Sequence, residues 1–346
     1  MESAQTKLLV ALIQAPDHLC YRYRIGAFLP ALVERGWRVE PIVVPRGTWA
    51  MLRQRPRIAA ADVVVLQRRL YSWWHRELIR SAARVLVFDF DDAVYGRDSG
   101  SLKPAQSWRC RQRFRGTVRM ADAVTAGNAH LVQQAGAAGG LDKTHYLPTC
   151  INPELYEPAD HQRPRSEIRL VWIGNPSTTH SLSAAGACLA EACRRVPGTL
   201  LQVISSSFPE LPGVPVVPCP WSSATEALDL AAGDIGVSWL PEHPWSLGKC
   251  GLKVLQYMSA GLPVVANPTG IHRELVRHGE TGFLAATPQQ WADAIARLAS
   301  APALRTQMGR AGRAFVQQHY SVARWQNWLG EFFDTLALSG KAPQKQ

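Results

Sequence analysis

Short apolar segments that resemble β-strands alternate with amphipathic, helix-like segments along most of this chain. Such alternation predicts an α/β fold, in which parallel strands are joined by crossover helices. In the first half of the chain, the expected strands are Leu8–Ile13, Val39–Val44, Val63–Leu66, Val85–Phe90, Ala123–Thr125 and Tyr146–Leu147. In the second half, they are Leu170–Ile173, Leu200–Ile204, Val214–Val217, Ile235–Trp239 and Val264–Ala266. Each half therefore has the pattern of one Rossmann-like domain.

With 346 residues, the chain is long enough for two domains of ordinary size. We expect the first domain at residues 1–158 and the second at residues 166–319, because Pro153–Arg165 is rich in proline and charge like a linker. Residues 320–338 are expected to form a last helix with a buried aromatic stripe made of Trp325, Trp328, Phe332 and Phe333. Other helices are predicted at Ile25–Arg35, Gln289–Ala299 and Leu304–His319.

The composition is that of a globular protein, with 47% apolar and 19% charged residues. Its formal net charge of +11 indicates an anionic partner, and the candidates are nucleic acid, an anionic membrane surface, a nucleotide sugar and a lipid phosphate. No zinc-knuckle spacing, RNP-like strand or helix-turn-helix signature accompanies the charge, so nucleic acid is not expected. The basic residues cluster at Arg46–Arg57, Arg76–Arg84 and Arg109–Arg119, where ordinary solvated helix faces are the alternative explanation.

Seven cysteines are scattered from Cys20 to Cys250 without a Cys-x-x-Cys pair, which favours a reducing compartment over disulfides or a zinc site. The first residues do not have the pattern of a signal peptide, and no apolar run approaches the ~18 residues of a membrane-spanning helix. We therefore expect a cytoplasmic protein without a metal site, and peripheral association with the inner membrane face is an option.

The segment Leu247–Ala266 has the pattern of a glycine-containing turn, an amphipathic helix and a buried strand. Gly248 and Gly251 allow backbone N–H groups to approach a ligand, and the N-terminus of a helix adds partial positive charge. Lys249 and Lys253 are four residues apart, which places two ammonium groups on one helical face or at its entrance. The segment therefore indicates a diphosphate site, although glycine-containing strand–turn–helix units without a ligand are also common.

Further motifs follow this segment in order. Asn267–Gly270 is a polar turn, Glu274 belongs to a short helix over Ile271–His278, and residues 279–284 read Gly-Glu-Thr-Gly-Phe-Leu. Together these residues resemble the donor-binding segment of the family 4 (group 1) retaining glycosyltransferases, which have the GT-B fold. The resemblance implies two Rossmann-like domains that face an interdomain cleft, with the C-terminal helix returning to the N-terminal domain.

The same resemblance implies a function. It predicts transfer of a sugar from a nucleotide-diphosphate sugar to an acceptor with retention of anomeric configuration, without a metal ion or other cofactor. The donor is expected in the second domain, and a glycan, lipid-linked or small-molecule acceptor in the first. A GT-B nucleotide-sugar epimerase and a non-catalytic glycosyltransferase-like partner are the alternatives, because the motif departs from the family pattern.

The departures concern the residues that contact the donor. The family usually has two glutamates separated by seven residues, and this chain has Gly248 and Gln256 at those positions. Gln256 can still hydrogen-bond ribose hydroxyls, but nothing replaces the first carboxylate. The usual Arg and Lys after the first strand of the second domain are also missing, and Gly174, Asn175 and Ser177 follow it instead. The other donor-binding candidates are Trp221 (stacked on a base or simply packed), Lys249, Gly251, Leu252, Lys253 and Glu274.

Three carboxylates stand at the end of the expected strand Val85–Phe90, namely Asp89, Asp91 and Asp92. Ligands of open α/β sheets bind beyond the carboxyl ends of the strands. By its position in the family pattern, Asp91 is the candidate catalytic residue beside the donor sugar and the acceptor, and Asp92 is the second choice. A helix cap and ion pairs to nearby arginines are the alternative roles.

Two further candidates lie on the acceptor side. Tyr21–Arg24 resembles a Ser-Arg-Tyr-Arg turn of part of the family, so Arg22 and Arg24 are candidates for phosphate contacts. Pairing of either arginine with a surface carboxylate is the alternative. Asn128 borders the same region, although we expect it mainly to cap the helix that follows.

Overall fold

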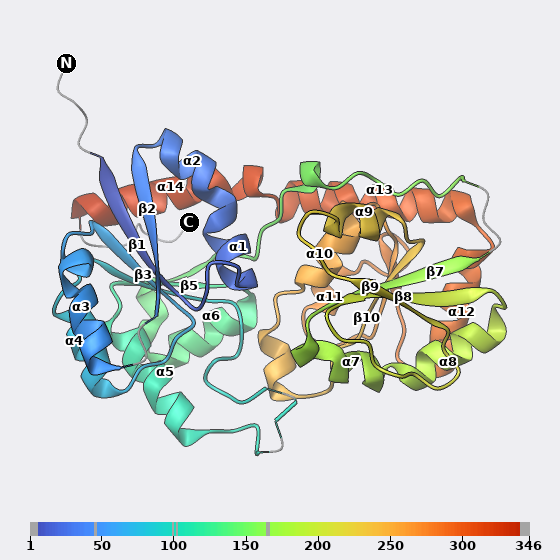
Figure 1. Ribbon diagram of the computed structural model, residues 1–346, viewed down its shortest axis with the longest axis horizontal. Coiled ribbons are helices and arrows are strands. Elements are labelled where there is room, and N and C mark those ends of the chain that lie inside the picture. Colours follow the sequence, from blue (N-terminus) through green and yellow to red (C-terminus); the bar gives the residue numbers. More distant parts are fainter. Residues whose placement is uncertain (1–5, 45–46, 99, 102, 164–166, 340–346) are drawn as a thin grey trace. The chain divides into compact units, whose positions relative to one another are not determined.

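A computed structural model describes residues 6–44, 47–98, 100–101, 103–163 and 167–339 (Figure 1). The chain divides into two compact units. Unit 1 comprises Met1–Cys150, Gly248–Cys250 and Val322–Gln346, and unit 2 comprises Ile151–Leu247 and Gly251–Ser321. The first segment of unit 1 thus ends at Cys150, eight residues before the expected boundary. Unit 1 also includes three residues from the start of the expected donor segment. Arg46 and Arg165, the predicted ends of a basic cluster and of the linker, lie outside the described residues.

Unit 1 contains a six-stranded sheet in the order β2-β1-β3-β4-β5-β6, in which every pair is parallel. The strands are β1 (Lys7–Ile13), β2 (Trp37–Val43), β3 (Val63–Gln67), β4 (Leu86–Phe90), β5 (Ala123–Ala126) and β6 (Thr144–Tyr146). All six predicted strands are confirmed within two residues at either end. Strands β3, β4 and β5 are buried along their full length, because helices cover both faces of a parallel sheet.

Helices lie on both faces of this sheet. They are α1 (Leu19–Arg24), α2 (Leu29–Glu34), α3 (Thr48–Ala59), α4 (Trp73–Arg80), α5 (Trp108–Met120), α6 (Ala129–Ala135) and α14 (Val322–Ser339). Since crossovers between parallel strands are right-handed, α3, α4, α5 and α6 share one face. Helices α2 and α14 pack together on the other face (Figure 1).

The first helical segment differs from its prediction. Instead of one helix over Ile25–Arg35, the chain forms α1 earlier, with His18 as its N-cap, and starts α2 at Leu29. A proline in the first turn of α2 favours a fresh helix start there. Arg22 and Arg24 therefore lie within α1 rather than in a turn before it.

Helix α14 closes the core of unit 1, as expected for a C-terminal helix that returns to the N-terminal domain. Phe332 and Phe333 are buried against the sheet, and Trp325 and Trp328 pack at its margin. Asp334 anchors the helix further, because its Oδ1 accepts hydrogen bonds from the Lys7 ammonium at 2.6 Å and the Trp37 indole at 2.8 Å. The predicted aromatic stripe is thus confirmed as packing.

Unit 2 contains a second parallel sheet, in the order β12-β11-β10-β7-β8-β9. Its strands are β7 (Ile168–Ile173), β8 (Thr199–Ser205), β9 (Val216–Pro220), β10 (Ile235–Ser238), β11 (Val264–Ala266) and β12 (Gly282–Leu284). Strand β12 was not among the predicted strands. Its pairing with β11 needs a glycine at position 282, because a Cβ there would overlap the backbone of Val264. The third strand also begins two residues later than predicted.

The helices of unit 2 are α7 (Thr179–Ala184), α8 (Gly186–Arg195), α9 (Glu226–Ala231), α10 (Leu252–Ser259), α11 (His272–Leu275), α12 (Pro288–Ala299) and α13 (Pro302–His319). The predictions for α12 and α13 are confirmed within two residues. Thr287 and Gln290 form a capping box at the start of α12, which fixes that boundary. None of the described helices is long and apolar enough to cross a bilayer.

Candidate functional site

The carboxyl end of β4 in unit 1 carries the three predicted carboxylates, and the first of them is fully engaged. The single N–H of Arg24 Nε is shared between the two Asp89 oxygens, each at 2.9 Å, and Arg24 Nη2 donates to Asp89 Oδ1 at 2.5 Å. Gln67 Nε2 and Thr125 Oγ1 donate to it as well, at 3.0 and 2.7 Å. Asp89 thus connects α1 with β3 and β5, which makes it a structural centre of this sheet edge.

This ion pair determines the environment of Arg24. Its side chain is 0% exposed, and its remaining donor Nη1 reaches the Leu147 carbonyl at 2.8 Å. Arg24 therefore takes the alternative role of pairing with a carboxylate, but in the interior rather than at the surface. Arg22 is half-buried, with its guanidinium 5.0 Å from the centroid of the Tyr23 ring.

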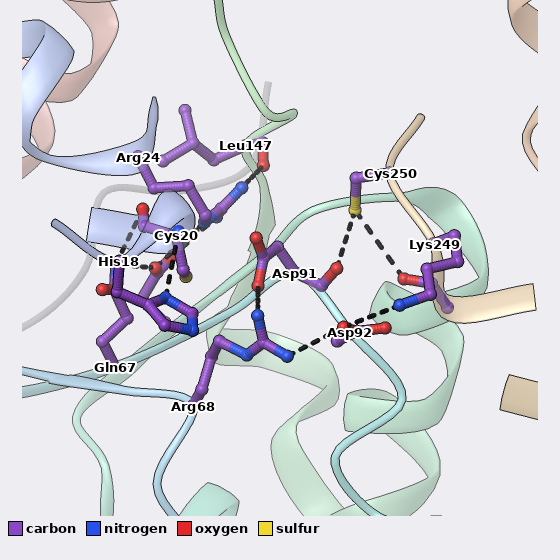
Figure 2. Close-up of polar contacts among 12 residues, drawn as sticks. His18, Cys20, Arg24, Gln67, Arg68, Asp91, Asp92, Leu147, Lys249 and Cys250 are labelled. Carbon is purple, nitrogen blue, oxygen red and sulfur yellow. Dashed lines mark hydrogen bonds and ion pairs between the residues drawn. The ribbon is translucent and has the colours of Figure 1, made fainter. Parts of the chain in front are cut away.

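Asp91 and Asp92 both form ion pairs with one guanidinium, that of Arg68 (Figure 2). Arg68 lies 3.4 Å from Asp91 Oδ1 and donates to Asp92 Oδ2 at 2.8 Å, and Asp92 Oδ2 also accepts from Lys249 Nζ at 3.1 Å. Burial acts to raise the pKa of Asp91, but the Arg68 and Arg24 cations outweigh it and lower that pKa. Burial raises the pKa of Asp92, and Lys249 and Arg68 only partly oppose it. The two neighbouring carboxyls therefore differ in proton affinity, as in many acid–base sites.

Sequence reasoning missed Arg68. It follows β3 directly, and its backbone has φ of 57°, a left-handed conformation that a non-glycine residue rarely adopts. Its N–H donates to the Asp89 carbonyl at 2.8 Å, which holds the turn against β4. The available signal was its position: an arginine just after an expected strand, at the kind of strand end where ligands of open α/β sheets bind. Strain of this kind is often found at functional sites.

The segment Gly248–Cys250 packs on the same edge of unit 1. Asn128 caps α6 through its Oδ1, as predicted, and its Nδ2 donates to the Lys249 carbonyl at 2.9 Å. Cys250 Sγ donates to the Asp91 carbonyl at 3.2 Å. Gly248 is required for close packing, because a Cβ there would lie 2.6 Å from the Ala93 nitrogen. The glycine expected to expose N–H groups to a ligand thus contacts the protein itself.

In unit 2, the predicted phosphate segment begins at Gly251, whose φ of 71° starts α10 at Leu252. Lys253 lies in the first turn of this helix. Its ammonium is 3.3 Å from Thr178 Oγ1 and 3.9 Å from the centroid of the Trp172 ring, a cation–π contact. Trp172 is buried in β7 and was not anticipated as a site residue. The two contacts orient the lysine at the positive end of the helix.

Gly174 is needed for this arrangement. A Cβ at that position would overlap the Trp172 ring and lie 2.7 Å from Thr178 Oγ1. Asn175 and Ser177 follow on the exposed side of the same loop, where the Ser177 hydroxyl donates to Asn175 Oδ1 at 2.7 Å. The predicted residues Gly174, Asn175 and Ser177 thus belong to the same loop as Thr178, which contacts Lys253.

The remaining donor-binding candidates of unit 2 differ in exposure. Gln256 is 3% exposed on α10, whereas Glu274 on α11 is exposed. Trp221 is 41% exposed directly after β9, and its indole donates to Glu226 Oε2 at 2.7 Å. The buried Glu226 also accepts from Tyr156 at 2.9 Å, so the indole plane of Trp221 is held from one edge.

His272 is a buried residue that sequence reasoning did not single out. Its Nδ1 lies 2.9 Å from the Asn267 carbonyl, which can only accept, so Nδ1 carries the proton. Its Nε2 then accepts from the Ser238 hydroxyl at 2.9 Å. Burial lowers the pKa of His272 to about 4, and the Lys253 charge contributes to the decrease. The imidazole is therefore neutral near pH 7.

Residues 230–301 match the family model described as glycosyl transferases group 1. This span contains the start of α10 and, with it, most of the predicted donor-binding residues. No curated protein matches the sequence.

Solved structures resemble the chain over almost its full length. Sucrose-phosphate synthase from Thermosynechococcus elongatus has a TM-score of 0.71 at 15% identity, covering 95% of this chain and 99% of that one. HepE from Anabaena in complex with UDP-glucose has a TM-score of 0.69 at 16% identity, covering 95% and 100%. The fold is GT-B. A glycosyltransferase from Rickettsia africae ESF-5 has a TM-score of 0.68 at 13% identity, covering 97% and 100%.

At such low identities, the solved structures establish the fold alone. The GT-B fold confirms the predicted α/β architecture, and the group 1 match agrees with the resemblance of the donor segment. Together they support a GT-B glycosyltransferase.

Proposed function

We propose that the protein is a glycosyltransferase that transfers a sugar from a nucleotide-diphosphate sugar to an acceptor with retention of anomeric configuration. The observation that carries this proposal is the start of α10, where Gly251 and Lys253 form a cationic helix N-terminus within the segment that matches group 1 glycosyltransferases. A helix N-terminus with a lysine in its first turn suits a diphosphate.

The donor is assigned to unit 2. Lys253 and the first N–H groups of α10 would stabilise the negative charge that develops on the leaving diphosphate, which is the main requirement of such a transfer. The cation–π contact with Trp172 keeps the ammonium in place before the donor arrives. Similar structures of HepE hold UDP and UDP-glucose, so UDP and UDP-glucose are the first ligands to test.

The acceptor is assigned to unit 1, where Asp91 and Asp92 share Arg68. Asp91 is the proposed catalytic residue, because its lowered pKa keeps the carboxylate charged beside a partial positive charge on the reacting sugar. Lys249, paired with Asp92, is the second cation that we propose for the donor phosphates. No step of this scheme requires a metal ion.

The test begins with binding. Isothermal titration calorimetry with UDP and other nucleoside diphosphates should reveal one site, and incubation with UDP-sugars should release UDP in the presence of an acceptor. Nuclear magnetic resonance of the product then gives its anomeric configuration, and activity should persist in excess EDTA. Inversion, or loss of activity in EDTA with rescue by manganese, would overturn the corresponding part of the proposal.

Two alternatives follow from Gly248 and Gln256, which stand where the family has glutamates. A nucleotide-sugar epimerase would change the configuration of the donor at C2 without an acceptor. A non-catalytic partner would bind nucleotides weakly and release no UDP. Both outcomes are read from the same incubations, so one set of assays separates the three functions.

We also propose a cytoplasmic location. All seven cysteines are free thiols, and Cys20, Cys150 and Cys250 are buried without a disulfide partner. Such usage is typical of a reducing compartment.

A further inference from the structure

Four tryptophans of unit 1 are exposed although tryptophan is usually highly buried. Trp49 is 82% exposed, Trp73 63%, Trp74 55% and Trp108 73%. Each lies in the first turn of a helix: Trp49 in α3, Trp73 and Trp74 in α4, and Trp108 in α5. We refer to these four residues as the tryptophan rim.

The topology places the rim along one edge of unit 1. Helices α3, α4 and α5 follow β2, β3 and β4 and form one layer, so each begins at the carboxyl edge of the sheet (Figure 1). Contacts connect neighbouring helices near these starts: Thr48 Oγ1 lies 3.4 Å from His75 Nε2, and Arg76 Nη1 donates to the Arg113 carbonyl at 3.4 Å. The four indoles therefore follow consecutive helix starts in a single layer.

The helices behind the rim are strongly basic. Helix α3 has three arginines and α5 has five, and neither contains an acidic residue, whereas α4 contains Glu77. Some of this charge is neutralised, since Arg57 pairs with Glu40 and Arg80 with Asp122. No carboxylate in the described part of the chain lies within ion-pairing distance of three other arginines, Arg53, Arg111 and Arg115.

The free arginines lie on the same helix faces as the tryptophans. Arg53 follows Trp49 by four residues, and Arg111 follows Trp108 by three, spacings at which helix side chains are neighbours. Both arginines are exposed. The surface thus combines apolar rings at its edge with unneutralised positive charge directly beside them.

We propose that the tryptophan rim and these arginines dock unit 1 on a bilayer that contains anionic lipids. Tryptophan prefers the boundary between headgroups and acyl chains, and arginines are attracted to anionic headgroups. Nucleic acid is the less suitable partner, because bases stack on flat aromatic platforms. Trp73 and Trp74 are tilted by 53° to each other with centroids 6.0 Å apart, which does not form such a platform.

Docking would turn the carboxyl edge of the unit 1 sheet, which carries the proposed catalytic carboxylates, toward the bilayer. The rim lies at the carboxyl edge of the sheet, where β4 ends beside Asp91 and Asp92. The bilayer would then lie next to this edge of unit 1, which favours an acceptor that is attached to a lipid. This consequence rests on the proposed function, whereas docking itself does not.

Vesicle flotation tests the proposal directly. The full-length protein should float with vesicles of equimolar phosphatidylcholine and phosphatidylglycerol and not with pure phosphatidylcholine. Replacing Arg53, Arg111 and Arg115 by glutamine should weaken partitioning about fivefold for each arginine near the surface. A rim variant (Trp49→Ala, Trp73→Ala, Trp108→Ala) should lose the binding that persists in high salt.

The control is a variant of unit 2, Leu228→Ala with Arg310→Gln, which removes one exposed apolar side chain and one exposed arginine. It should bind vesicles like the wild type, and the melting temperatures of all variants should show that they are folded. The proposal is overturned if the wild type does not float with anionic vesicles, or if the rim and arginine variants bind as the control does. Rim-dependent binding to a single-stranded oligonucleotide without vesicle binding would assign the surface to nucleic acid instead.

Discussion

Lys249 and Lys253 are four residues apart in the sequence, yet they have different partners. Gly251 lies between them with a left-handed backbone, so the helix begins only at Leu252 and the two lysines do not share a helical face. Lys249 pairs with Asp92 in unit 1, while Lys253 contacts Thr178 and Trp172 in unit 2. The two ammonium groups should therefore contribute unequally to nucleotide binding.

Lys253→Ala should weaken the binding of UDP by about 1.5–3 kcal/mol, the usual contribution of a hydrogen bond to a charged group. Lys249→Ala should have a smaller effect, because its ammonium is already engaged by Asp92. Isothermal titration calorimetry measures both changes, with Lys253→Arg as the control that retains the charge. Unchanged affinity in both alanine variants would place the phosphates elsewhere on the protein.

Asp91→Asn should reduce turnover by about 10²–10⁴-fold, the contribution of a positioned acid–base group, while the affinity for UDP stays the same. The substitution keeps the size of the side chain and leaves Arg68 paired with Asp92. Steady-state kinetics, together with Asp92→Asn, shows which carboxyl matters. If turnover per folded molecule stays normal and only the melting temperature falls, Asp91 has a structural role.

Asp89→Asn tests the neighbouring carboxylate, which should matter for folding and not for chemistry. It would leave the fully buried guanidinium of Arg24 without its charged partner. Breaking such a buried pair costs about 3–5 kcal/mol in the free energy of unfolding. Urea unfolding measures this loss, and Arg24→Lys should be destabilised as well because lysine cannot reproduce the two-pronged contact. A stability equal to that of the wild type would show that the pair is dispensable.

At the scale of elements, most of the fold was predicted from hydrophobic periodicity and from the capping residues and prolines at helix starts. The buried strands have apolar runs that are readable from sequence, and α12 and α13 begin where a capping residue or proline stands. The break between α1 and α2 and the short strand β12 were not predicted. The break follows a local signal that the prediction did not use, the proline in the first turn of α2. The strand β12 depends on its pairing with Val264–Ala266, a segment some way back along the chain.

The candidate site was only partly predictable for the same reason. The Asp-rich end of β4 and the Gly251–Lys253 turn are local patterns, so the sequence identifies them. The partners of these residues come from other elements: Arg68 from the end of β3 and Trp172 from β7. A single sequence does not reveal which arginine reaches which carboxylate, because that depends on how the strands are ordered in the sheet.

His272 joins α11 to the end of β10, and this connection should depend on pH. The pKa of His272 falls from 6.5 to about 4 in the folded state. The unfolded chain binds this proton below about pH 6.5, so the folded state loses stability as the pH falls toward 4, by up to about 3 kcal/mol. Relative to His272→Gln, the wild type should lose more stability between about pH 7 and pH 4.5 in urea unfolding.

The matched control for this experiment is His278→Gln, which replaces an exposed histidine. Burial lowers the pKa of His161 as well, so the informative quantity is the difference in pH dependence between each variant and the wild type. The change in pH dependence caused by His272→Gln should exceed the change caused by His278→Gln. The same pH dependence in His272→Gln and in the wild type would show that His272 is not the group responsible.

At the scale of the whole molecule, the two units are not two consecutive stretches of the sequence. Unit 1 is built from the first 150 residues but is completed by Gly248–Cys250 and by α14. The core of unit 1 therefore includes residues that lie far along the chain from its strands, such as Phe332 and Phe333. Unit 2 contains its own core around Trp172 and Trp291 and takes nothing from α14.

Phe332→Ala should destabilise unit 1 alone. This ring is 1% exposed and lies 5.1 Å from Trp328 and 5.3 Å from His145 between centroids, so its removal leaves a cavity that costs about 3–5 kcal/mol. Hydrogen exchange measured by mass spectrometry should increase in β1 and β3, while β7 and β8 remain as protected as in the wild type. The matched variant Ile295→Ala should show the reverse pattern, because Ile295 belongs to the core of unit 2. An equal increase in both sheets would mean that the two units unfold as one.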